Sequence, residues 1–223
     1  MMFAADDSMV NKIDIKGLIF WNIDTQIDFV YPRGKLYVEG AEVVRPQWKE
    51  LTRLAKEKSI RVVNTADYHF PNSAEIDPNP DFVNTFPEHC MVKTRGADFI
   101  KETDPEDPVI FDWNKNYLIT PELFEKADHR NIIIRKDAFD VFSGNQYTEN
   151  ILKYLDPQTV VVYGVATNVC VDMQVRSLIK RVKSVFVVED AIKELPDIPL
   201  PFDVWKKKGV ELITLSQLKN MLN

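Results

Sequence analysis

The chain has 223 residues, of which 45% are hydrophobic and 28% charged, and its net charge is −6 at pH 7. This composition is typical of a globular protein with its own core. The acidic balance argues against nucleic acid or an anionic membrane as partner, because such binding uses clustered Lys and Arg. No apolar run approaches the roughly 20 residues of a membrane span, and two cysteines do not suggest a disulfide framework. We therefore expect a cytoplasmic protein.

The first half of the chain predicts two βα units and then a long loop. Gly17 to Ile23 is a short apolar run that favours a buried strand. Apolar residues at helical spacing follow from Glu42 to Lys58, and Arg61 to Ala66 predicts a second strand. Residues 67–108 are rich in Pro, Asn and Asp, which indicates a long ordered loop. Loops of this length inside a compact domain are usually functional.

The alternation of strands and helices resumes after the loop. Such alternation predicts an α/β fold: a three-layer αβα sandwich around a mostly parallel sheet of about six strands, buried on both faces. We expect one domain, residues 15–223, after an N-terminal arm of residues 1–14. The remaining expected elements are strand 131–135, helix 146–155, strand 159–163, helix 169–181, strand 184–189, helix 201–208, strand 210–214 and a closing helix from 215.

Residues that carry chemistry follow directly after four of the predicted strands. They are Asp24, Asp67, Lys136 and the turn from Gly164 to Cys170. In parallel sheets of this class, active sites lie at the carboxyl ends of the strands. The sequence therefore predicts that these four distant segments meet at one edge of the sheet.

A metal site is predicted in the long loop. Asp67 and His69 are two residues apart, and His89 offers a third ligand from across the loop. Two histidines and one carboxylate with open positions fit Zn²⁺, Fe²⁺ or Mn²⁺. Spare oxygen ligands stand nearby at Glu75, Asp77 and Asp81. The alternative is that the two histidines only cap turns in the loop.

Cys170 is the first candidate for a nucleophile. It follows a predicted strand and opens a predicted helix, where the dipole and the free N–H groups would acidify a thiol and hold an oxyanion. The alternative is a buried structural cysteine, which is the commoner role of a lone cysteine. Cys90, beside His89, is the rival nucleophile, but no strand-to-helix turn precedes it.

The base that would activate Cys170 is predicted to be a carboxylate. His69 and His89 are assigned to the metal, and His129 lies in what reads as a surface turn. Asp24 stands at the predicted edge, and a carboxylate beside a thiolate would have a raised pKa that suits proton transfer. Lys136, at the end of a strand on the same edge, is the candidate cation.

At this point the motifs resemble those of the isochorismatase-like cysteine hydrolases, and within them the nicotinamidase/pyrazinamidase branch. The resemblance runs from about residue 16 to the end. It is carried by Asp24 to Phe29 (D-x-Q-x-D-F), Thr65 to His69 (D-x-H), Phe86 to Ala97 (similar to W-P-x-H-C-x-x-G-T-x-G-A), Lys136 to Phe142, and Gly164 to Val171 (G-x-A-T-[DN]-x-C-V).

The resemblance implies a catalytic triad. Cys170 would form a thioester with release of ammonia, Asp24 would be the base, and Lys136 the cation. The Val165–Ala166 bond would be cis, so that the N–H groups of Ala166 and Cys170 form the oxyanion hole.

The resemblance also implies a metal and a substrate class. Asp67, His69 and His89 would hold one divalent metal, with zinc the first choice and iron or manganese as alternatives. Phe29 and Phe86 would be aromatic walls for a small-molecule amide such as nicotinamide. A homo-oligomer, a dimer or a tetramer, is expected of this fold.

Departures from the family pattern concern the substrate and leave the triad and ligands intact. Phe86 replaces the usual Trp, Val92-Lys93 replaces x-Gly, Arg95 replaces a small residue or Pro, and the Lys136 segment lacks an insertion found in many nicotinamidases. The departures leave open the hydrolysis of another small amide, carbamoyl or ureido compound. Three other readings are considered: an isochorismatase proper, which needs neither the metal ligands nor a cysteine; a catalytically silent binding protein; and a redox-sensing thiol protein that uses Cys90 and Cys170.

Overall fold

The computed structural model describes residues 12–125 and 131–223. Within these residues, one seven-stranded sheet runs through the molecule, and all its strands are parallel, in the order β3-β4-β2-β1-β5-β6-β7. The strands are β1 (Leu18–Ile23), β2 (Arg61–Asp67), β3 (Val109–Phe111), β4 (Asn131–Lys136), β5 (Thr159–Val165), β6 (Ser184–Lys193) and β7 (Glu211–Ile213).

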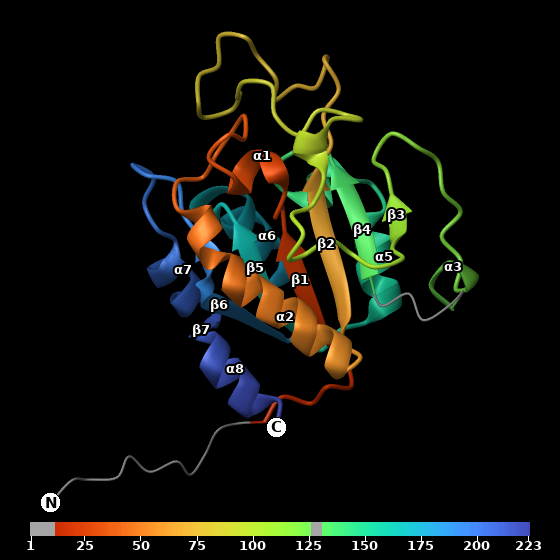
Figure 1. Cartoon of the computed structure of the whole chain (residues 1–223). Coiled ribbons are helices and arrows are strands. Elements are labelled where there is room, and N and C mark those ends of the chain that lie inside the picture. The colour runs from red at the N-terminus through yellow and green to blue at the C-terminus, as the bar shows by residue number, and fades with distance from the viewer. Residues whose placement is uncertain (1–11, 126–130) are drawn as a thin grey trace, which may run out of the picture.

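Helices cover both faces of this sheet, which gives the three-layer arrangement that the sequence predicts (Figure 1). They are α1 (Ile27–Val30), α2 (Arg45–Glu57), α3 (Glu122–Glu125), α4 (Val141–Gly144), α5 (Thr148–Leu155), α6 (Asp172–Leu178), α7 (Phe202–Lys207) and α8 (Leu215–Met221). Short 3₁₀ turns span Ala41–Val44 and Arg95–Ala97, and a π-helical turn spans Thr167–Val171.

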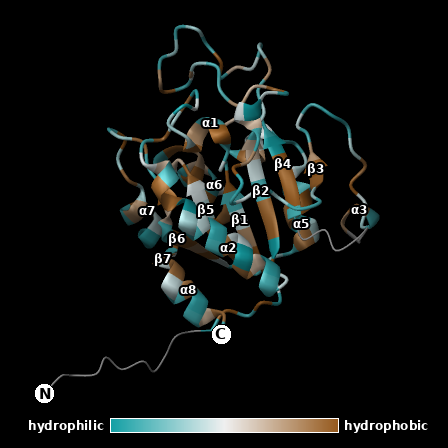
Figure 2. Ribbon diagram, viewed as in Figure 1, coloured by the Kyte–Doolittle hydropathy of each residue, from teal (hydrophilic) through white to brown (hydrophobic). Residues whose placement is uncertain are grey.

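The side chains of each strand point alternately to the two faces of the sheet, so the hydrophobic core has two halves, one on each face. Leu18 and Phe20 of β1 pack on the side of α2 and α8, whereas Ile19, Trp21 and Ile23 pack on the side of α5, α6 and α7. Successive side chains of a strand point to opposite faces, so a strand covered on both sides must be apolar throughout. Figure 2 shows this result as hydrophobic strands between helices whose outer faces are hydrophilic.

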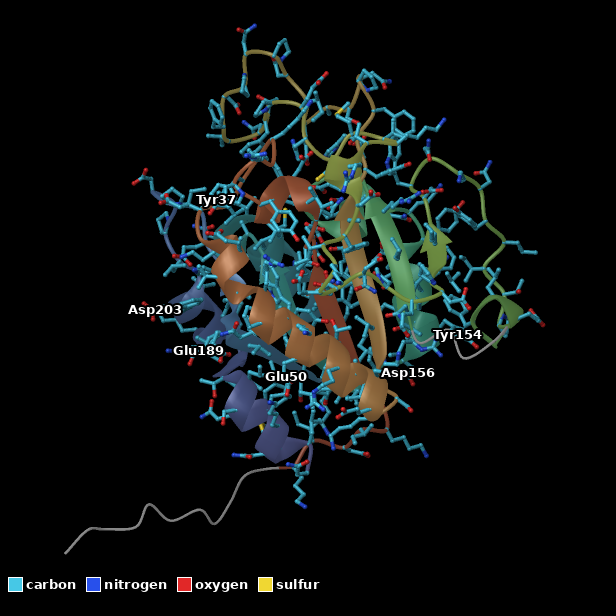
Figure 3. All side chains as sticks on the ribbon, in the orientation of Figure 1. Tyr37, Glu50, Tyr154, Asp156, Glu189 and Asp203 are labelled. Carbon is cyan, nitrogen blue, oxygen red and sulfur yellow. The ribbon has the colours of Figure 1, made fainter. Side chains whose placement is uncertain are left out.

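Polar contacts join the helices on their solvent side. Glu50 lies on α2 (Figure 3). It forms ion pairs with Arg53 of the same helix and with Lys219 of α8. Exposed pairs of this kind contribute little to the free energy of unfolding. The burial of the apolar faces is therefore the main contribution that holds α2 and α8 to the sheet.

The expected elements are found with shifted ends. The helix expected at 42–58 is a 3₁₀ turn followed by α2, and the helix expected at 169–181 is the π turn followed by α6. The strand expected at 184–189 continues to Lys193 beyond a register shift. The sheet has seven strands rather than about six because β3, only three residues long, is too short to show a pattern in sequence.

The long loop after β2 is ordered by a few backbone contacts. A parallel bridge joins His69 to Met91, and another joins Ile76 to Phe86.

Most of the N-terminal arm (residues 1–11) and the turn expected around His129 lie outside the described residues. Among the described helices, none is both long and apolar enough to cross a bilayer.

Gly164 provides a test of how tightly the central strands meet. Its φ is +128°, and a Cβ added there would lie 2.0 Å from the carbonyl oxygen of Ile23. We expect Gly164→Ala to lower the free energy of unfolding by roughly 2–5 kcal/mol, because strained backbone and overpacking each cost about 1–3 kcal/mol. Urea denaturation measures the difference.

Gly209 is the matched control for this prediction. Its φ is +82°, and a Cβ added there would meet nothing within 4 Å. Gly209→Ala should cost only the conformational penalty of about 1–2 kcal/mol. Equal losses in the two variants would show that the close approach of β5 to β1 is not what restricts position 164.

Candidate functional site

The sheet topology brings the predicted residues to one edge. Strands β4, β2, β1 and β5 are consecutive in the sheet, and they end at Lys136, Asp67, Ile23 (followed by Asp24) and Val165. Asp67 and Lys136 are register partners. The four segments that are distant in sequence therefore meet where parallel strands end, as predicted.

Lys136 lies at the centre of this cluster. Its Nζ donates a hydrogen bond to Asp67 Oδ1, lies 3.0 Å from Asp24 Oδ2 and lies 3.9 Å from Cys170 Sγ. The lysine is fully buried, and burial lowers the pKa of an ammonium. The two carboxylates outweigh burial and hold the pKa of Lys136 well above its usual value. The cation therefore remains charged.

Asp24 occupies a left-handed backbone conformation, with φ of 51°, directly after β1. Its Oδ1 accepts a hydrogen bond of 2.7 Å from the Thr65 hydroxyl, and its Oδ2 has no partner in hydrogen-bond geometry among the described residues. Burial raises the pKa of Asp24 to about 6, although Lys136 acts in the opposite direction. The direction of the shift agrees with the prediction, but its main cause is burial and not a neighbouring thiolate.

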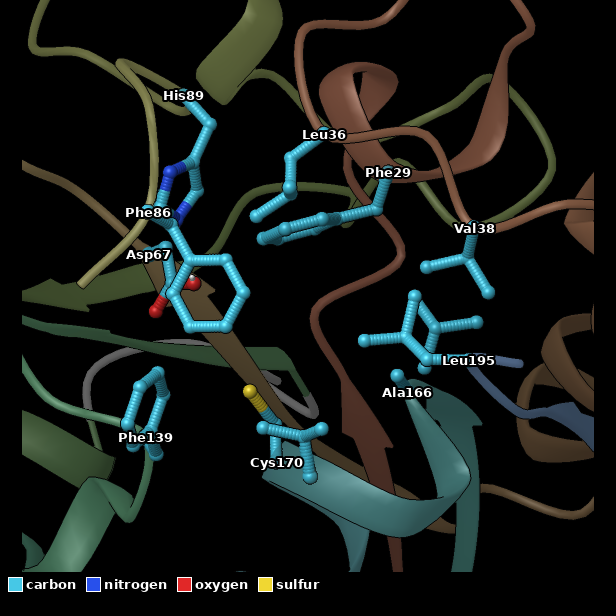
Figure 4. A pocket seen from close by; sticks show the side chains of 12 residues that line it. Phe29, Leu36, Val38, Asp67, Phe86, His89, Phe139, Ala166, Cys170 and Leu195 are labelled. Carbon is cyan, nitrogen blue, oxygen red and sulfur yellow. Dashed lines mark ion pairs between the residues drawn. The ribbon is translucent and has the colours of Figure 1, made fainter. Parts of the chain in front are cut away.

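Cys170 lies in the π turn that follows β5, and its sulfur points into a pocket (Figure 4). The Val165–Ala166 peptide before this turn is cis, as the resemblance implies. Ala166 and Cys170 both line the pocket, and their role as oxyanion donors stays a prediction.

The prediction that the pKa of the Cys170 thiol is lowered is wrong for the site without substrate. Burial raises the pKa of the Cys170 thiol well above its usual value, and Lys136 lowers it only in part. The sequence argument considered the helix dipole and not the dry surroundings of the sulfur. A protonated thiol needs a neighbouring base, and Asp24 is close enough: its carboxylate, that of Asp67 and the sulfur lie within 4.8 Å of one another.

The predicted ligands Asp67, His69 and His89 also converge. One ligand atom from each lies within 4.8 Å of the others. His69 Nε2 is 3.8 Å, and His89 Nε2 3.7 Å, from Asp67 Oδ2. This spacing leaves room for an ion between the three atoms.

Contacts on the far side of each imidazole orient these ligands. His69 Nδ1 is 2.6 Å from Asp137 Oδ1, and His89 Nδ1 is 2.8 Å from the Pro87 carbonyl oxygen. Each Nε2 is therefore left to face Asp67, as is common in metal sites. His69 Nε2 is buried without a hydrogen-bond partner among the described residues, which fits a nitrogen placed for a metal.

Glu75 adds an oxygen to this cluster. Its Oε2 is buried without a hydrogen-bond partner within the described residues and lies 3.9 Å from His69 Nε2. Burial, followed by the negative charge of Asp67, raises the pKa of Glu75 to about 7. Asp67, His69 and His89 form the group that fits a divalent cation, and Glu75 lies beside it. Asp77 and Asp81, also considered as spare ligands, are not part of the group.

Two residues of the D-x-Q-x-D-F segment hold the site without facing the pocket. Gln26 accepts a hydrogen bond from the Asp67 N–H and donates to the carbonyls of Asp67 and Ala97. Asp28 accepts from the N–H groups of Lys35 and Cys90. Sequence reasoning quoted these residues as part of the motif and did not assign them a role.

The pocket between the two clusters is apolar. Its empty space is about 390 Å³, which includes the part that opens to solvent. Phe29 and Phe86 both line it, as predicted, and their rings lie 5.5 and 6.3 Å from that of His89. Four further lining residues were not predicted from sequence: Leu36, Val38, Phe139 and Leu195 (Figure 4). Phe139 lies in the quoted Lys136–Phe142 segment, and the other three lie on loops without a recognisable motif.

Cys90 is separated from this pocket. Its side chain is fully buried, its sulfur is 3.7 Å from the Gly96 carbonyl, and burial raises the pKa of its thiol well above the usual value. Cys90 does not line the pocket around Cys170. The structure thus favours Cys170 over its rival.

Comparison with known proteins agrees with this geometry. Residues 114–198 match the family model of the isochorismatase domain, a segment that includes Lys136 and Cys170. No curated protein matches the chain by sequence.

Several solved structures share the fold. A pyrazinamidase of Pyrococcus horikoshii in complex with zinc has 24% identity and a TM-score of 0.67, over 89% of this chain and 99% of that one. An N-carbamoylsarcosine amidase of Thermoplasma acidophilum has 20% identity and a TM-score of 0.68, over 89% and 96%. A pyrazinamidase/nicotinamidase of Streptococcus mutans has 22% identity and a TM-score of 0.66, over 88% and 99%. The family model thus matches the part of the chain that contains β4, β5 and α6, and the solved structures show that most of the chain has the same fold as these amidases.

Proposed function

We propose that this protein is a metal-containing cysteine amidohydrolase that converts nicotinamide, or a similar neutral heteroaromatic amide, to the acid and ammonia. One observation carries the proposal: Cys170, Asp67 and His89 line the same apolar, aromatic pocket. Lys136 lies 3.9 Å from the Cys170 sulfur and 3.0 Å from Asp24, and His69 completes the ligand group with Asp67 and His89. A substrate ring between them would place its amide carbon near the sulfur.

The first half of the proposed reaction follows from the geometry. Asp24 takes the proton from Cys170 Sγ as the sulfur attacks the amide carbon, so that no free thiolate is needed in a site where burial disfavours it. The N–H groups of Ala166 and Cys170 would hold the oxyanion. Asp24 then gives the proton to the leaving nitrogen, and ammonia departs to leave a thioester.

Water completes the reaction by the reverse proton path. Asp24 removes a proton from the water that attacks the thioester, and the same proton returns to the Cys170 sulfur as the acid is released. Lys136 remains charged throughout and offsets the negative charge that Asp24 and the sulfur share. When bound, a divalent metal would supply a positively charged anchor for a ring nitrogen of the substrate.

The pocket favours a neutral substrate over a carbamoyl or ureido acid. Its described lining residues include no Lys or Arg, and those around the ring position are aromatic or aliphatic. A substrate carboxylate placed away from the metal ligands would be buried there without a cationic partner, which is costly. This supports an amide such as nicotinamide, although a carbamoyl amidase is among the structural neighbours.

The direct test is ammonia release from nicotinamide by the metal-loaded protein. Cys170→Ala should lower kcat by roughly a thousandfold or more, as losses of catalytic nucleophiles do. Cys90→Ala is the matched control and should keep its activity, because Cys90 does not line the pocket. Release of ammonia from N-carbamoylglycine in place of nicotinamide would exclude the proposed substrate, and full activity of Cys170→Ala would exclude the mechanism.

The pH dependence of the reaction should reflect the state of Asp24. The carboxylate accepts a proton only when it is ionised, and burial raises its pKa to about 6. We therefore expect kcat/KM to fall tenfold per pH unit as the pH drops below about 6, a range in which an ordinary aspartate is still ionised. A profile that stays flat down to pH 4 would contradict the role of Asp24.

Removal of one ligand should separate metal binding from folding. His89→Ala leaves two of the three predicted ligands, so we expect loss of bound metal and a raised KM with the fold retained. Metal content by elemental analysis and circular dichroism report the two effects.

The adjacent residue gives the control for the metal prediction. Glu88 is exposed and pairs with Lys35, so Glu88→Gln should keep the metal. If His89→Ala bound as much metal as Glu88→Gln, the assignment of His89 as a ligand would be wrong.

A further inference from the structure

A chain of three hydrogen bonds leads from the sheet to Asp24. The indole Nε1 of Trp21 donates to Gln174 Oε1 at 2.8 Å, and Gln174 Nε2 donates to Thr65 Oγ1 at 3.3 Å. The Thr65 hydroxyl then donates to Asp24 Oδ1 at 2.7 Å. All four side chains are fully buried.

The direction of this hydrogen-bond chain is fixed by its first member. An indole nitrogen can only donate, so the oxygen of the Gln174 amide faces Trp21 and its nitrogen faces Thr65. The Thr65 hydroxyl accepts from that nitrogen and has a single proton, which is left for Asp24. The hydroxyl proton thus cannot turn away from the carboxylate while Gln174 is in place.

As a consequence, the two carboxylate oxygens of Asp24 differ in their hydrogen-bond partners. Oδ1 accepts from Thr65, whereas Oδ2 has no hydrogen-bond partner among the described residues. Oδ2 lies 3.0 Å from the Lys136 nitrogen, and the same nitrogen lies 3.9 Å from the sulfur of Cys170. Oδ2 is thus the oxygen on the side of Lys136 and the thiol.

We propose that Gln174, acting through Thr65, is a positioning residue that keeps Oδ2 of Asp24 as the atom that receives the Cys170 proton. In that step the S–H bond breaks, an O–H bond forms at Oδ2, and the sulfur electron pair becomes the nucleophile. Gln174 stands four residues after Cys170, about one helical turn along α6. One helical segment thus presents the nucleophile and orients its base. The inference rests on the proposed role of Asp24.

Steady-state kinetics on nicotinamide test this positioning role. We expect Gln174→Leu and Thr65→Val each to lower kcat roughly ten- to hundredfold with KM unchanged, the loss expected for a hydrogen bond to a charged group. Because the two residues act in series, the double variant should be no slower than Thr65→Val alone. Thr65→Ser, which keeps the hydroxyl, should restore kcat to near the original value.

The matched control is Thr103→Val. Thr103 is a buried threonine whose hydroxyl is 2.7 Å from that of Thr25, outside the hydrogen-bond chain to Asp24. Its loss tests the general effect of removing a buried hydroxyl. The inference is overturned if Thr103→Val lowers kcat as much as Thr65→Val, or if Gln174→Leu has the original kcat.

A second measurement does not depend on the substrate. Iodoacetamide alkylates Cys170 with loss of iodide, and the rate can be followed by mass spectrometry of its peptide. Proton removal by Asp24 should speed this reaction, so Gln174→Leu should slow it about tenfold or more. An unchanged alkylation rate in Gln174→Leu overturns the inference.

The alkylation rate also distinguishes a wrong assignment of the substrate from a wrong assignment of Asp24 as the base. If the original protein releases no ammonia from nicotinamide while Gln174→Leu still slows alkylation, the substrate is wrong and the positioning role stands. If Asp24→Asn leaves the alkylation rate unchanged, Asp24 is not the base, and both the proposed mechanism and the inference fail.

Discussion

The buried ammonium of Lys136 is the interaction on which the rest of the site depends. Asp24 and Asp67 have almost no exposed surface, and two ionised carboxylates so close together would be strongly destabilising without a cation between them. Lys136 offsets part of this cost, and the sheet places it there because β4 and β2 are adjacent in register. Removing such a partner leaves uncompensated buried charge.

One lysine does not balance the whole cluster. Asp24, Asp67 and Glu75 are all buried near it, and Glu75 has an oxygen with no hydrogen-bond partner among the described residues. A divalent cation between Asp67, His69 and His89 would offset the remaining negative charge. The donor set of Asp67, His69 and His89 is one that such a cation fits.

Several hydrogen bonds around the site fix the positions of the metal ligands and of the segment that carries them. Gln26 binds the backbone of Asp67, Asp28 binds the backbone of Cys90, and Asp137 fixes the ring of His69. Gln26 and Asp28 are buried and Asp137 is half-buried, and hydrogen bonds of this kind limit the rotation of the groups that they hold. The loop after β2 can therefore carry ligands although it has little regular structure of its own.

The sequence by itself determined the parallel α/β architecture and the meeting of Asp24, Asp67, Lys136 and Cys170 at one edge. The reason is that hydrophobic period predicts the strands and helices, and the carboxyl ends of parallel strands lie at the same edge of a sheet. Only the tertiary structure decided the raised pKa of Cys170, the lining by Leu36 and Leu195, the β3 strand and the connection of Gln174 to Asp24. These depend on burial and on contacts between side chains far apart in the chain. Neither quantity is encoded in the spacing of residues along a single segment.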